Sequence, residues 1–404
     1  MSNRKKATQY PCTDAGNAEL IAALFGEILR YDHRQGRWLI WDKRRNRWRE
    51  DKLDEVRNLA IASARNRRRL GALLSDEKES KKEISWAFTS EDRYRLDAAL
   101  IVAQSLPHIS DAGTGWDADE WLFGVENGVI DLRTGKLREE RPEDRITKHS
   151  PVCFDPAAKC PRFDVFLKEI FNDDVALVDY IQRSIGYCLT GSVREQCVFC
   201  RYGAGGNGKT TLCNVERYIF GDYAVNLPFS ALEMKNRNSN DLVALVGARL
   251  ATAAETNEGV RLNEARIKVL TGGDPITARK LYHEGFTFEP THKLILAFNH
   301  KPIIADASEG MWRRVRLIPF TQQFKPDQEM DLPDELRAEA SGILAWAVRG
   351  CLLWQKEGLG EPPAVANATT VPQTRCLRSL PRCSSLQIAT VGPYSAGFWS
   401  SLLP

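Results

Sequence analysis

The sequence lacks two features that would tie it to a membrane. None of its apolar runs is long enough to cross a bilayer. Its opening stretch, MSNRKKATQYPCTDAG, lacks the apolar core of a signal peptide. We therefore expect a cytoplasmic protein with no membrane partner.

A strong excess of one charge is also missing. The 56 basic and 53 acidic residues leave a net charge of only +3, so composition alone points to no class of partner. Hydrophobic residues make up 43% and charged residues 27% of the chain, which is typical of a soluble globular protein. A chain of 404 residues is too long for one ordinary core, so we expect two or three domains.

The ten cysteines lack the pattern of a disulfide scaffold or a zinc site. They are scattered through predicted strands and helices, so we interpret them as reduced thiols. Cys197 and Cys200 have the spacing of a metal-ligand pair, but no second pair follows at the spacing of a zinc site. The sequence therefore argues against a zinc centre.

Basic residues are concentrated near the N-terminus. Residues 42–51 read DKRRNRWRED and residues 64–70 read ARNRRRL. Such runs are usually solvated faces, but in a nucleic-acid-binding protein they contact phosphates. Both interpretations stay open.

The first part of the chain, to about Asp174, is predicted to mix strands and helices. Residues 36–48 (GRWLIWDKRRNRW) alternate apolar and polar side chains as a hairpin does. A second hairpin is expected over residues 122–139, with turns at Asn127-Gly128 and Thr134-Gly135. Between them, residues 53–106 have the pattern of helices with basic outer faces.

The later part of the chain predicts an α/β fold. Two helices are expected up to about residue 190, with Gly191 as the C-cap of the second. Three strand candidates follow, separated by helical segments, which is typical of an AAA+-like ATPase with a parallel sheet flanked by helices. These strands are predicted at residues 196–201, 248–255 and 292–299.

A single helix is expected over Glu335–Gly358, with the apolar side chains of Ile343, Leu344, Ala347 and Leu352 on one face.

A glycine-rich loop lies between the first of these strands and a helix that is predicted to begin at Lys209. Gly203, Gly208, Lys209 and Thr210 satisfy the G-x-x-x-x-G-K-[ST] pattern of a phosphate-binding loop. Small residues let backbone N–H groups point at a triphosphate, and the helix N-terminus adds positive potential. We expect ATP and Mg²⁺ as cofactors, with Lys209 on the β and γ phosphates and the Thr210 hydroxyl on the metal. The other candidate nucleotide-binding residues are Ala204, Gly205, Gly206, Asn207 and Thr211.

A nucleotide hydrolase also needs an acid at the end of a neighbouring strand, to hold the metal and polarise the attacking water. Glu255 ends the strand candidate ARLATAAE and is our candidate for both tasks. Glu258 follows three residues later, either as a second catalytic acid or as part of a solvated loop.

Two further polar positions suit a catalytic role. Asn299 follows a buried strand, where its amide can orient water against the γ-phosphate or can simply form a turn. Arg313 and Arg314 precede another apolar run. They either belong to a surface ion pair, or one of them enters the nucleotide site of a neighbouring subunit.

A hairpin is also predicted between the acid strand and the asparagine strand, over ITARKLYHEGFTF. Its tip would carry Arg279, Lys280 and His283, with Tyr282 nearby. Cations beside an aromatic ring suit a nucleic-acid backbone and its bases. An ordinary charged turn is the alternative.

These motifs, in this order and spacing, resemble the superfamily III helicase module of the phage and plasmid primase-helicases, of the satellite-phage P-four and poxvirus type. The resemblance rests on GAGGNGKTT, AAETNEGVRLNEARIKVLTGGDPITARKLY, KLILAFNHKP and GMWRRVRLIPF. The upstream WLIWD, NGVIDLRTGKL and LTGSVREQ are similar to the domain that precedes this module, so the likeness covers roughly residues 13–366.

The resemblance implies a homo-hexameric ring in a bacterial or phage-infected cell. Such a ring hydrolyses ATP between subunits and moves 3′ to 5′ on single-stranded or forked DNA during replication initiation. Lys209 and Thr210 match Walker A, and Asn299 matches the polar sensor. Glu255, either alone or together with Glu258, matches Walker B. Arg313 or Arg314 matches the arginine finger.

The resemblance also implies a domain organisation. We expect a basic pre-helicase domain at residues 1–175, the ATPase at 176–325, a helical region at 326–362 and an irregular tail at 363–404. Because no cysteine cluster or catalytic acid group precedes the first domain, primer synthesis is expected from a separate primase or initiator. The tail has no acidic residue from Thr370 onward, and we hypothesise that a frame shift near Ala368 replaced the native C-terminus.

Two functions of different class fit these features. The first is a replicative DNA helicase. The second is an ATP-regulated DNA-binding assembly factor that recruits a primase or initiator without unwinding. A small-molecule P-loop kinase is poorly supported, because the double arginine and the basic hairpin would go unexplained.

Overall fold

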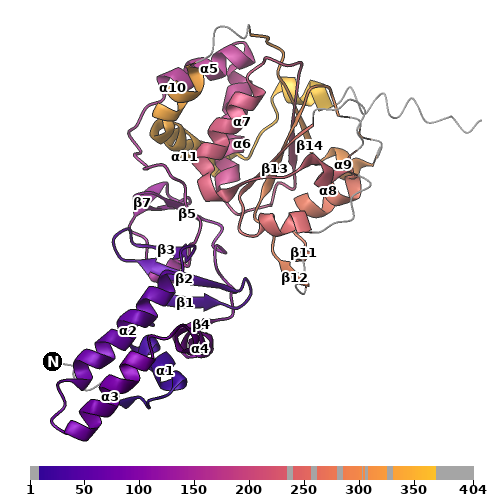
Figure 1. Ribbon diagram of the computed structural model, residues 1–404. Helices are drawn as coiled ribbons and strands as arrows, with labels where there is room; N and C mark the ends of the chain where they lie inside the picture. Colours follow the sequence, from indigo (N-terminus) through magenta and orange to yellow (C-terminus); the bar gives the residue numbers. More distant parts are fainter. Residues whose placement is uncertain are drawn as a thin grey trace, which may run out of the picture.

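The computed structural model describes residues 9–233, 240–255, 262–279, 285–302, 304, 308–324 and 331–369. An elongated N-terminal region and a larger α/β lobe meet at a narrow junction, which we call the waist (Figure 1). Glu258, Lys280, His283 and residues 370–404 lie outside the described residues, as does the greater part of the predicted tail.

The N-terminal region is built on a four-stranded sheet with the order β3-β2-β1-β4. The strands are β1 (Leu29–Asp32), β2 (Arg37–Asp42), β3 (Arg47–Glu50) and β4 (Ser110–Asp111). The predicted hairpin is confirmed, because β2 and β3 pair antiparallel. Trp41 and Trp116 pack edge-on against Trp48 from either side, with centroid distances of 5.5 and 5.4 Å, and stabilise the hairpin's inner face.

Helices cover this sheet and extend away from the lobe (Figure 1). They are α1 (Asp14–Phe25), α2 (Glu55–Gly71), α3 (Glu77–Thr89) and α4 (Arg93–Ala103). Side-chain caps mark the starts of α1 and α3: Thr13 accepts the Gly16 N–H, and the Asp76 carboxylate accepts two N–H groups of α3. The helices predicted between residues 53 and 106 are confirmed as α2, α3 and α4.

A small antiparallel sheet lies at the waist. It consists of β5 (Leu122–Val125), β6 (Gly128–Asp131) and β7 (Lys136–Arg138). Gly128 and Gly135 have φ values of 142° and 70°, which only glycine adopts without strain, at the two turns that the sequence predicts. A single 3-10 turn, Pro142–Asp144, follows.

The lobe contains a five-stranded parallel sheet with the order β14-β8-β13-β10-β9. Its strands are β8 (Val198–Tyr202), β9 (Ala224–Asn226), β10 (Leu250–Glu255), β13 (Lys293–Phe298) and β14 (Val315–Pro319). The three predicted strands are confirmed as β8, β10 and β13. An antiparallel hairpin, β11 (Ile276–Arg279) with β12 (Gly285–Phe288), projects from the lobe beside the sheet.

Helices cover both faces of the parallel sheet. Phe199 and Ile295 point into a core shared with α5 (Pro161–Phe171), α6 (Val175–Leu189) and α7 (Lys209–Phe220). The neighbouring strand residues point into a second core, on the opposite face. That second core is covered by α8 (Glu264–Thr271) and α9 (Glu309–Trp312). Parallel strands buried on both faces are the architecture that the sequence predicts.

Two more helices complete the first face: α10 (Leu332–Ala338) and α11 (Ala340–Glu357). Helix α11 packs closely on α6, because a Cβ on Gly186 would lie 2.1 Å from the Cys351 nitrogen. The apolar core on this side runs from β5 to α11 without interruption. Among the described residues, no helix is long and apolar enough to span a membrane.

Four details differ from the predictions. The single helix expected over Glu335–Gly358 is two helices that meet at Glu339. Leu352 is 36% exposed, whereas Ile343, Leu344 and Ala347 are buried. The prediction for Leu352 is wrong, because the buried face of α11 contains Cys351 and Trp354 instead.

The other two differences are at Gly191 and in the predicted tail. The C-cap of α6 is Thr190, and Gly191 is required for another reason: a Cβ there would lie 1.6 Å from Nη1 of Arg249. Residues 363–369, expected to be irregular, are helical, with Val365 and Ala368 buried in the lobe's two cores.

Candidate functional site

The predicted site residues gather at one edge of the parallel sheet. In the strand register, Tyr202 pairs with both Phe298 and Pro319, and Phe298 pairs with Glu255. The four strands therefore end in one row. Glu255 is the last residue of its strand in this row. Gly203 and Asn299 each come one residue after the row residues Tyr202 and Phe298. The structure therefore brings these three predicted residues together at the carboxyl edge of the sheet.

Residues 203–208, which we call the glycine loop, connect β8 to α7. Gly203, Gly206 and Gly208 have φ values of 157°, 68° and 78°. A Cβ on Gly203 would lie 2.1 Å from the Phe320 carbonyl oxygen, and one on Gly208 would lie 2.5 Å from Ile170. Backbone geometry and close packing thus require glycine at Gly203 and Gly208. Gly205 has open space around it, so no side chain covers the outer side of the loop there.

Lys209 extends back under the glycine loop. Its Nζ donates to the Gly203 carbonyl oxygen at 2.5 Å and to Oδ1 of Asn207 at 2.9 Å, and the residue is only 5% exposed. Burial lowers the pKa of Lys209 below its ordinary value. No carboxylate pairs with this ammonium group among the described residues. A cation held by carbonyl and amide oxygens is available to an anionic ligand.

The start of α7 offers backbone donors beside this lysine. Its N-cap is Gly208, so no side chain caps the helix. Thr210 is exposed in the first turn. Because the first N–H groups of a helix have no partner within it, this end of α7 carries partial positive charge where the glycine loop is open.

A buried ion pair fixes α7 against β8. Arg201 and Glu216 form two hydrogen bonds of 2.7 and 2.6 Å, and both side chains are almost fully buried. Burial alone would lower the pKa of Arg201, but Glu216 and Cys213 raise it above its ordinary value. The pair holds the helix that carries Lys209 at a fixed position relative to the strand.

The segment after β14 covers the glycine loop from the other side, a contact that the sequence analysis missed. The Phe320 N–H donates to the Tyr202 carbonyl at 2.8 Å, and the Phe324 N–H donates to the Gly206 carbonyl at 2.7 Å. Lys301 adds a cation 5.1 Å from the Tyr202 ring. The apolar run VRLIPF followed by polar TQQF was the available signal for this segment.

The two predicted polar groups at the edge differ in exposure. Asn299 is exposed just beyond β13, and Glu255 is half-buried at the end of β10. The carboxylate and the amide thus border the same open side of the sheet as the glycine loop. Glu258 lies outside the described residues.

The predicted arginines lie at the opposite edge. Arg313 and Arg314 precede β14, and the Val198 N–H at the start of β8 donates to the Arg314 carbonyl at 2.8 Å. Arg313 is exposed. Because a strand rises about 3.3 Å per residue, the five residues of β14 separate this pair from the carboxyl edge by about 16 Å. Within one chain the structure does not bring them to Lys209.

The predicted basic hairpin is present as β11 and β12, with Arg279 opposite Gly285 at the last described pair. Its β12 strand contacts the N-terminal region: Arg34 donates to the Thr287 carbonyl and lies 5.4 Å from the Phe286 ring centroid. Lys280 and His283 lie outside the described residues.

The pair Cys197 and Cys200 is buried, and burial raises the pKa of the Cys200 thiol to about 12. Over the described ranges, no group of three His, Cys, Asp or Glu side chains is arranged to hold a metal ion.

Two family models match the chain. Residues 18–172 match the one described as D5 N terminal like. Residues 201–314 match one described as a family of unknown function.

Viral proteins named as helicases or primases are similar in sequence. A helicase-named protein of Acanthamoeba polyphaga mimivirus is 29% identical over 286 residues, which cover 64% of this chain and 30% of the relative. A primase-named protein of African swine fever virus is 28% identical over 210 residues, which cover 50% of this chain and 22% of the relative. The chain thus spans less than a third of the length of these relatives.

Among solved structures, the C-terminal region of NrS-1 has the same fold, with a TM-score of 0.54 at 11% identity over 89% of this chain and 75% of that chain. The relatives carry the names helicase and primase, and the solved structure shares the fold. Together with the D5 N terminal like match over residues 18–172, they support the resemblance to a D5-type primase-helicase noted from the motifs.

Proposed function

We propose that this protein is an ATP-dependent DNA helicase of superfamily III, acting as a homo-hexameric ring for a phage, plasmid or integrated element. The observation that carries the proposal is the carboxyl edge of the sheet, where Lys209 and an uncapped helix end adjoin Glu255 and Asn299. This is the arrangement expected of an AAA+-like P-loop ATPase.

The residues fit a magnesium–nucleotide complex. The open side of Gly205 and the uncapped start of α7 leave room and donors for phosphate oxygens. Lys209, already desolvated and without a carboxylate partner among the described residues, would bind the β and γ phosphates. The hydroxyl of Thr210 and the carboxylate of Glu255 would hold Mg²⁺, which when bound neutralises charge between the phosphates.

The remaining polar residues have roles that follow from their positions. Glu255 accepts a proton from the attacking water, and the exposed Asn299 amide orients that water without adding charge. Because Arg313 and Arg314 lie about 16 Å from the carboxyl edge of their own sheet, we assign one of them to the site of the adjoining protomer. A ring is the closed assembly in which every site receives such an arginine.

Single-stranded or forked DNA is the proposed substrate, with 3′ to 5′ movement. The projecting hairpin β11–β12 supports this assignment, since Arg279 sits at its described end and Lys280 and His283 belong to the same segment. A separate primase or initiator is the proposed partner.

The test is strand displacement on a forked DNA duplex with ATP and Mg²⁺. The wild-type protein is expected to displace the strand, and Lys209→Ala is expected to lose displacement while keeping its melting temperature. ATP hydrolysis that single-stranded DNA stimulates, without displacement at any protein concentration, would favour the assembly factor instead.

The trans role of the arginines has its own test. A Lys209→Ala subunit and an Arg313→Ala/Arg314→Ala subunit are each expected to be inactive alone. Mixing them should restore part of the ATPase activity, because some interfaces then combine an intact loop with intact arginines. Absence of any rescue would mean that both sets act within one subunit.

A further inference from the structure

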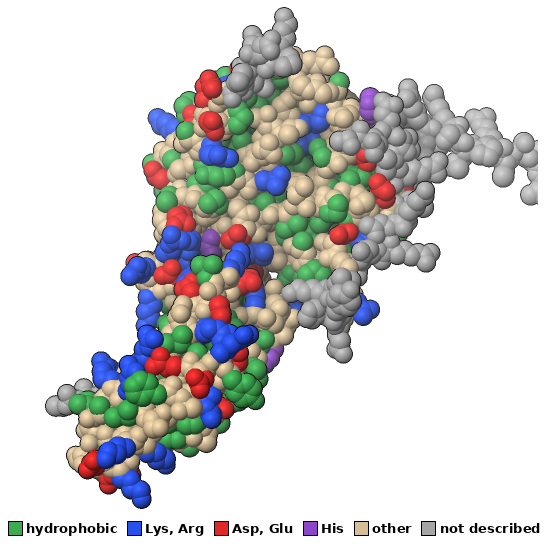
Figure 2. Space-filling view, in the orientation of Figure 1, with side chains coloured by type: hydrophobic (Ala, Val, Ile, Leu, Met, Phe, Trp, Pro, Cys, Tyr) green, Lys and Arg blue, Asp and Glu red, His purple; other side chains and the backbone are tan. Residues whose placement is uncertain are grey.

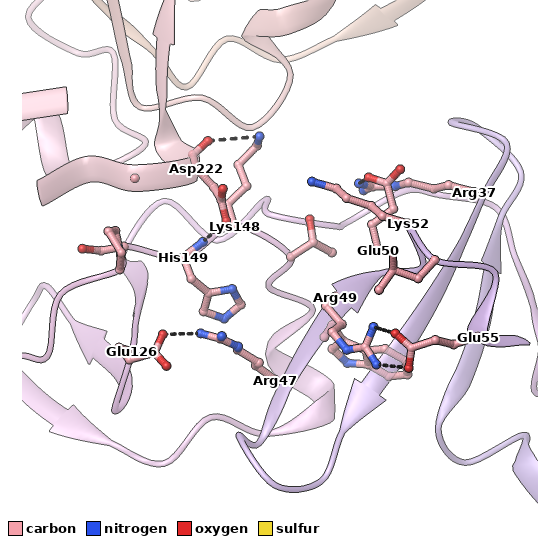
Figure 3. Close-up of a pocket in the computed structure, with 16 residues that line it drawn as sticks. Arg37, Arg47, Arg49, Glu50, Lys52, Glu55, Glu126, Lys148, His149 and Asp222 are labelled. Carbon is pink, nitrogen blue, oxygen red and sulfur yellow. Dashed lines mark hydrogen bonds and ion pairs between the residues drawn. The ribbon is translucent and has the colours of Figure 1, made fainter. Parts of the chain in front are cut away.

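We propose that the cleft at the waist is a second nucleic-acid contact, which binds the phosphate backbone of a strand at a distance from the β11–β12 hairpin. The cleft has a volume of ≈ 570 Å³ and lies between the N-terminal sheet and the lobe (Figure 3). Residues of β3 form one wall, and Lys148, His149 and Asp222 form the opposite wall. This inference goes beyond the proposed motor site, because none of these residues belongs to it.

Three of the four carboxylates that line this cleft are paired with arginines. Glu126 binds Arg47 at 2.8 Å, and Glu55 binds Arg49 through two hydrogen bonds of 2.6 Å (Figure 3). Glu50 pairs with Arg37 at 3.4 Å. The carboxylate of Asp222 accepts the His149 N–H at 3.2 Å.

The lining of the cleft has one more Lys or Arg side chain than Asp or Glu side chains, five against four. Lys52 is exposed on one wall and has no carboxylate partner in the described part of the chain. Across the cleft, Nζ of Lys148 donates to the backbone carbonyl of Asp222 at 3.3 Å, and no carboxylate pairs with it among the described residues. Each wall therefore presents one lysine without a carboxylate partner among the described residues.

The β2–β3 turn adds three more cations at the Arg47 end of the same wall. Lys43, Arg44 and Arg45 are exposed, and none of their side chains meets a carboxylate among the described residues. The turn itself is well defined, since the Asp42 carboxylate accepts the Arg44 N–H at 2.9 Å. Its exposed cations are thus presented outward by a rigid hairpin. Figure 2 shows Lys and Arg side chains gathered at the waist.

The arrangement fits a polyanion better than a small anion. The turn and Lys52 stand at opposite ends of β3, which spans about 13 Å. One DNA strand carries a phosphate about every 3.4 Å along the helix axis, so a bound strand would present several phosphates over this length. Cations spaced along a wall contact successive phosphates without reading bases, which is the way a backbone is positioned.

The test compares a turn variant and a control that each lose three positive charges, with a second waist variant that loses two. We would measure binding of a labelled single-stranded oligothymidylate by fluorescence anisotropy, without nucleotide, at several salt concentrations. The waist variants are Lys43→Ala/Arg44→Ala/Arg45→Ala and Lys52→Ala/Lys148→Ala. The control is Lys78→Ala/Lys81→Ala/Lys82→Ala, which removes three exposed lysines from α3, far from the cleft.

The proposal predicts that the turn variant binds about tenfold more weakly, with a shallower dependence of log Kd on log salt by about two. The Lys52/Lys148 variant should show a smaller loss in the same direction, and the α3 control should bind within about twofold of wild type. The DNA-independent ATPase activity should be unchanged in all three, because the Lys209 site is intact.

Equal DNA affinity in the turn variant and the α3 control would overturn the proposal and leave this surface to an acidic protein partner. That outcome is distinguishable from failure of the proposed function, in which the wild-type protein itself would hydrolyse no ATP. Because the turn side chains are exposed, the turn variant should fold normally, and an unchanged melting temperature checks this.

Discussion

The two edges of the parallel sheet use basic side chains in opposite ways. At the carboxyl edge, Lys209 donates to a loop carbonyl and an amide oxygen beside an open glycine loop, where Asn299 is exposed. At the amino edge, Lys293 and Arg249 are 3% and 1% exposed and are enclosed by backbone carbonyls.

The amino-edge cations hold the sheet to the segments that lead into it. Lys293 donates to the carbonyls of Thr190 and Thr291, the latter at 3.2 Å. Arg249 donates to the carbonyl of Asp119 at 2.6 Å, beside the strands of the waist. Neither has a carboxylate partner among the described residues, yet neither is accessible to a ligand.

A buried cation without a carboxylate partner therefore does not by itself mark a ligand-binding site. What distinguishes Lys209 is the uncapped helix beside it and the absence of bulk over Gly205. At the amino edge the corresponding space is filled, since a Cβ on Gly191 would strike Arg249. The carboxyl edge is thus open beside its lysine, whereas the amino edge is closed by packing.

The largest effect is expected at the carboxyl edge, from Glu255→Gln. Removing the base while keeping the shape should lower the rate of ATP hydrolysis on the order of 10³-fold. Binding of a non-hydrolysable ATP analogue should be retained. Steady-state ATPase assays and analogue titration measure the two quantities, and Asp274→Asn, in an exposed turn outside the site, is the control. Undiminished hydrolysis in Glu255→Gln would remove Glu255 from the site.

The next effect concerns the buried pair behind the glycine loop. Arg201→Met leaves Glu216 buried and unpaired, which should lower the free energy of unfolding by about 3 kcal/mol. The double variant Arg201→Met/Glu216→Leu should recover most of this loss, because no charge is then buried alone. Denaturant unfolding measures both. A double variant as unstable as the single one would show that packing, and not the ion pair, dominates.

A glycine at each edge gives a smaller, directly matched comparison. Gly191→Ala should lower stability by about 2 kcal/mol, because its Cβ would lie 1.6 Å from Arg249. Gly205→Ala, with no atom within 4 Å of the new Cβ, should change stability by less than about 0.5 kcal/mol. Thermal unfolding distinguishes them, and equal shifts would contradict the contrast between the edges.

The smallest effect is a pH dependence at the amino edge. Burial lowers the pKa of Lys293 from 10.5 to about 7. Between these values the folded lysine is neutral while the unfolded lysine still binds a proton, so stability should rise with pH over this range and lose that gain as pH falls through 7. Lys293→Met should flatten this dependence by on the order of 1 kcal/mol. Melting curves of both proteins at pH 7 and pH 9.5 measure this. The same change in stability between the two pH values in both proteins would contradict the prediction.

Much of the carboxyl edge could be predicted from sequence, because local patterns define it. The apolar strand, the glycines and the helix start are contiguous, so β8, the glycine loop and α7 follow from neighbouring residues. Glu255 and Asn299 follow because parallel strands end at a common edge. The hairpins at the waist could also be predicted, because neighbouring residues define their turns, which Gly128 and Gly135 mark.

The rest depended on contacts between distant residues. The placement of β14 beside β8, and the cover that Phe320 and Phe324 form over the glycine loop, join segments more than a hundred residues apart. Gly191 has the sequence position of a helix cap, but Arg249 decides its role. Leu352 has the sequence spacing of an apolar helix face. Its exposure depends on how α11 is oriented against α6, which the sequence pattern does not give.

The central claim is that the carboxyl edge binds a triphosphate through the glycine loop and Lys209. Titration of a non-hydrolysable ATP analogue with Mg²⁺ into the wild-type protein and into Lys209→Ala, followed by calorimetry, tests it most directly. The account predicts binding to the wild-type protein and at least a tenfold weaker affinity, about 1.4 kcal/mol, in the variant. Equal affinity in the two proteins, or no binding to either, would contradict it.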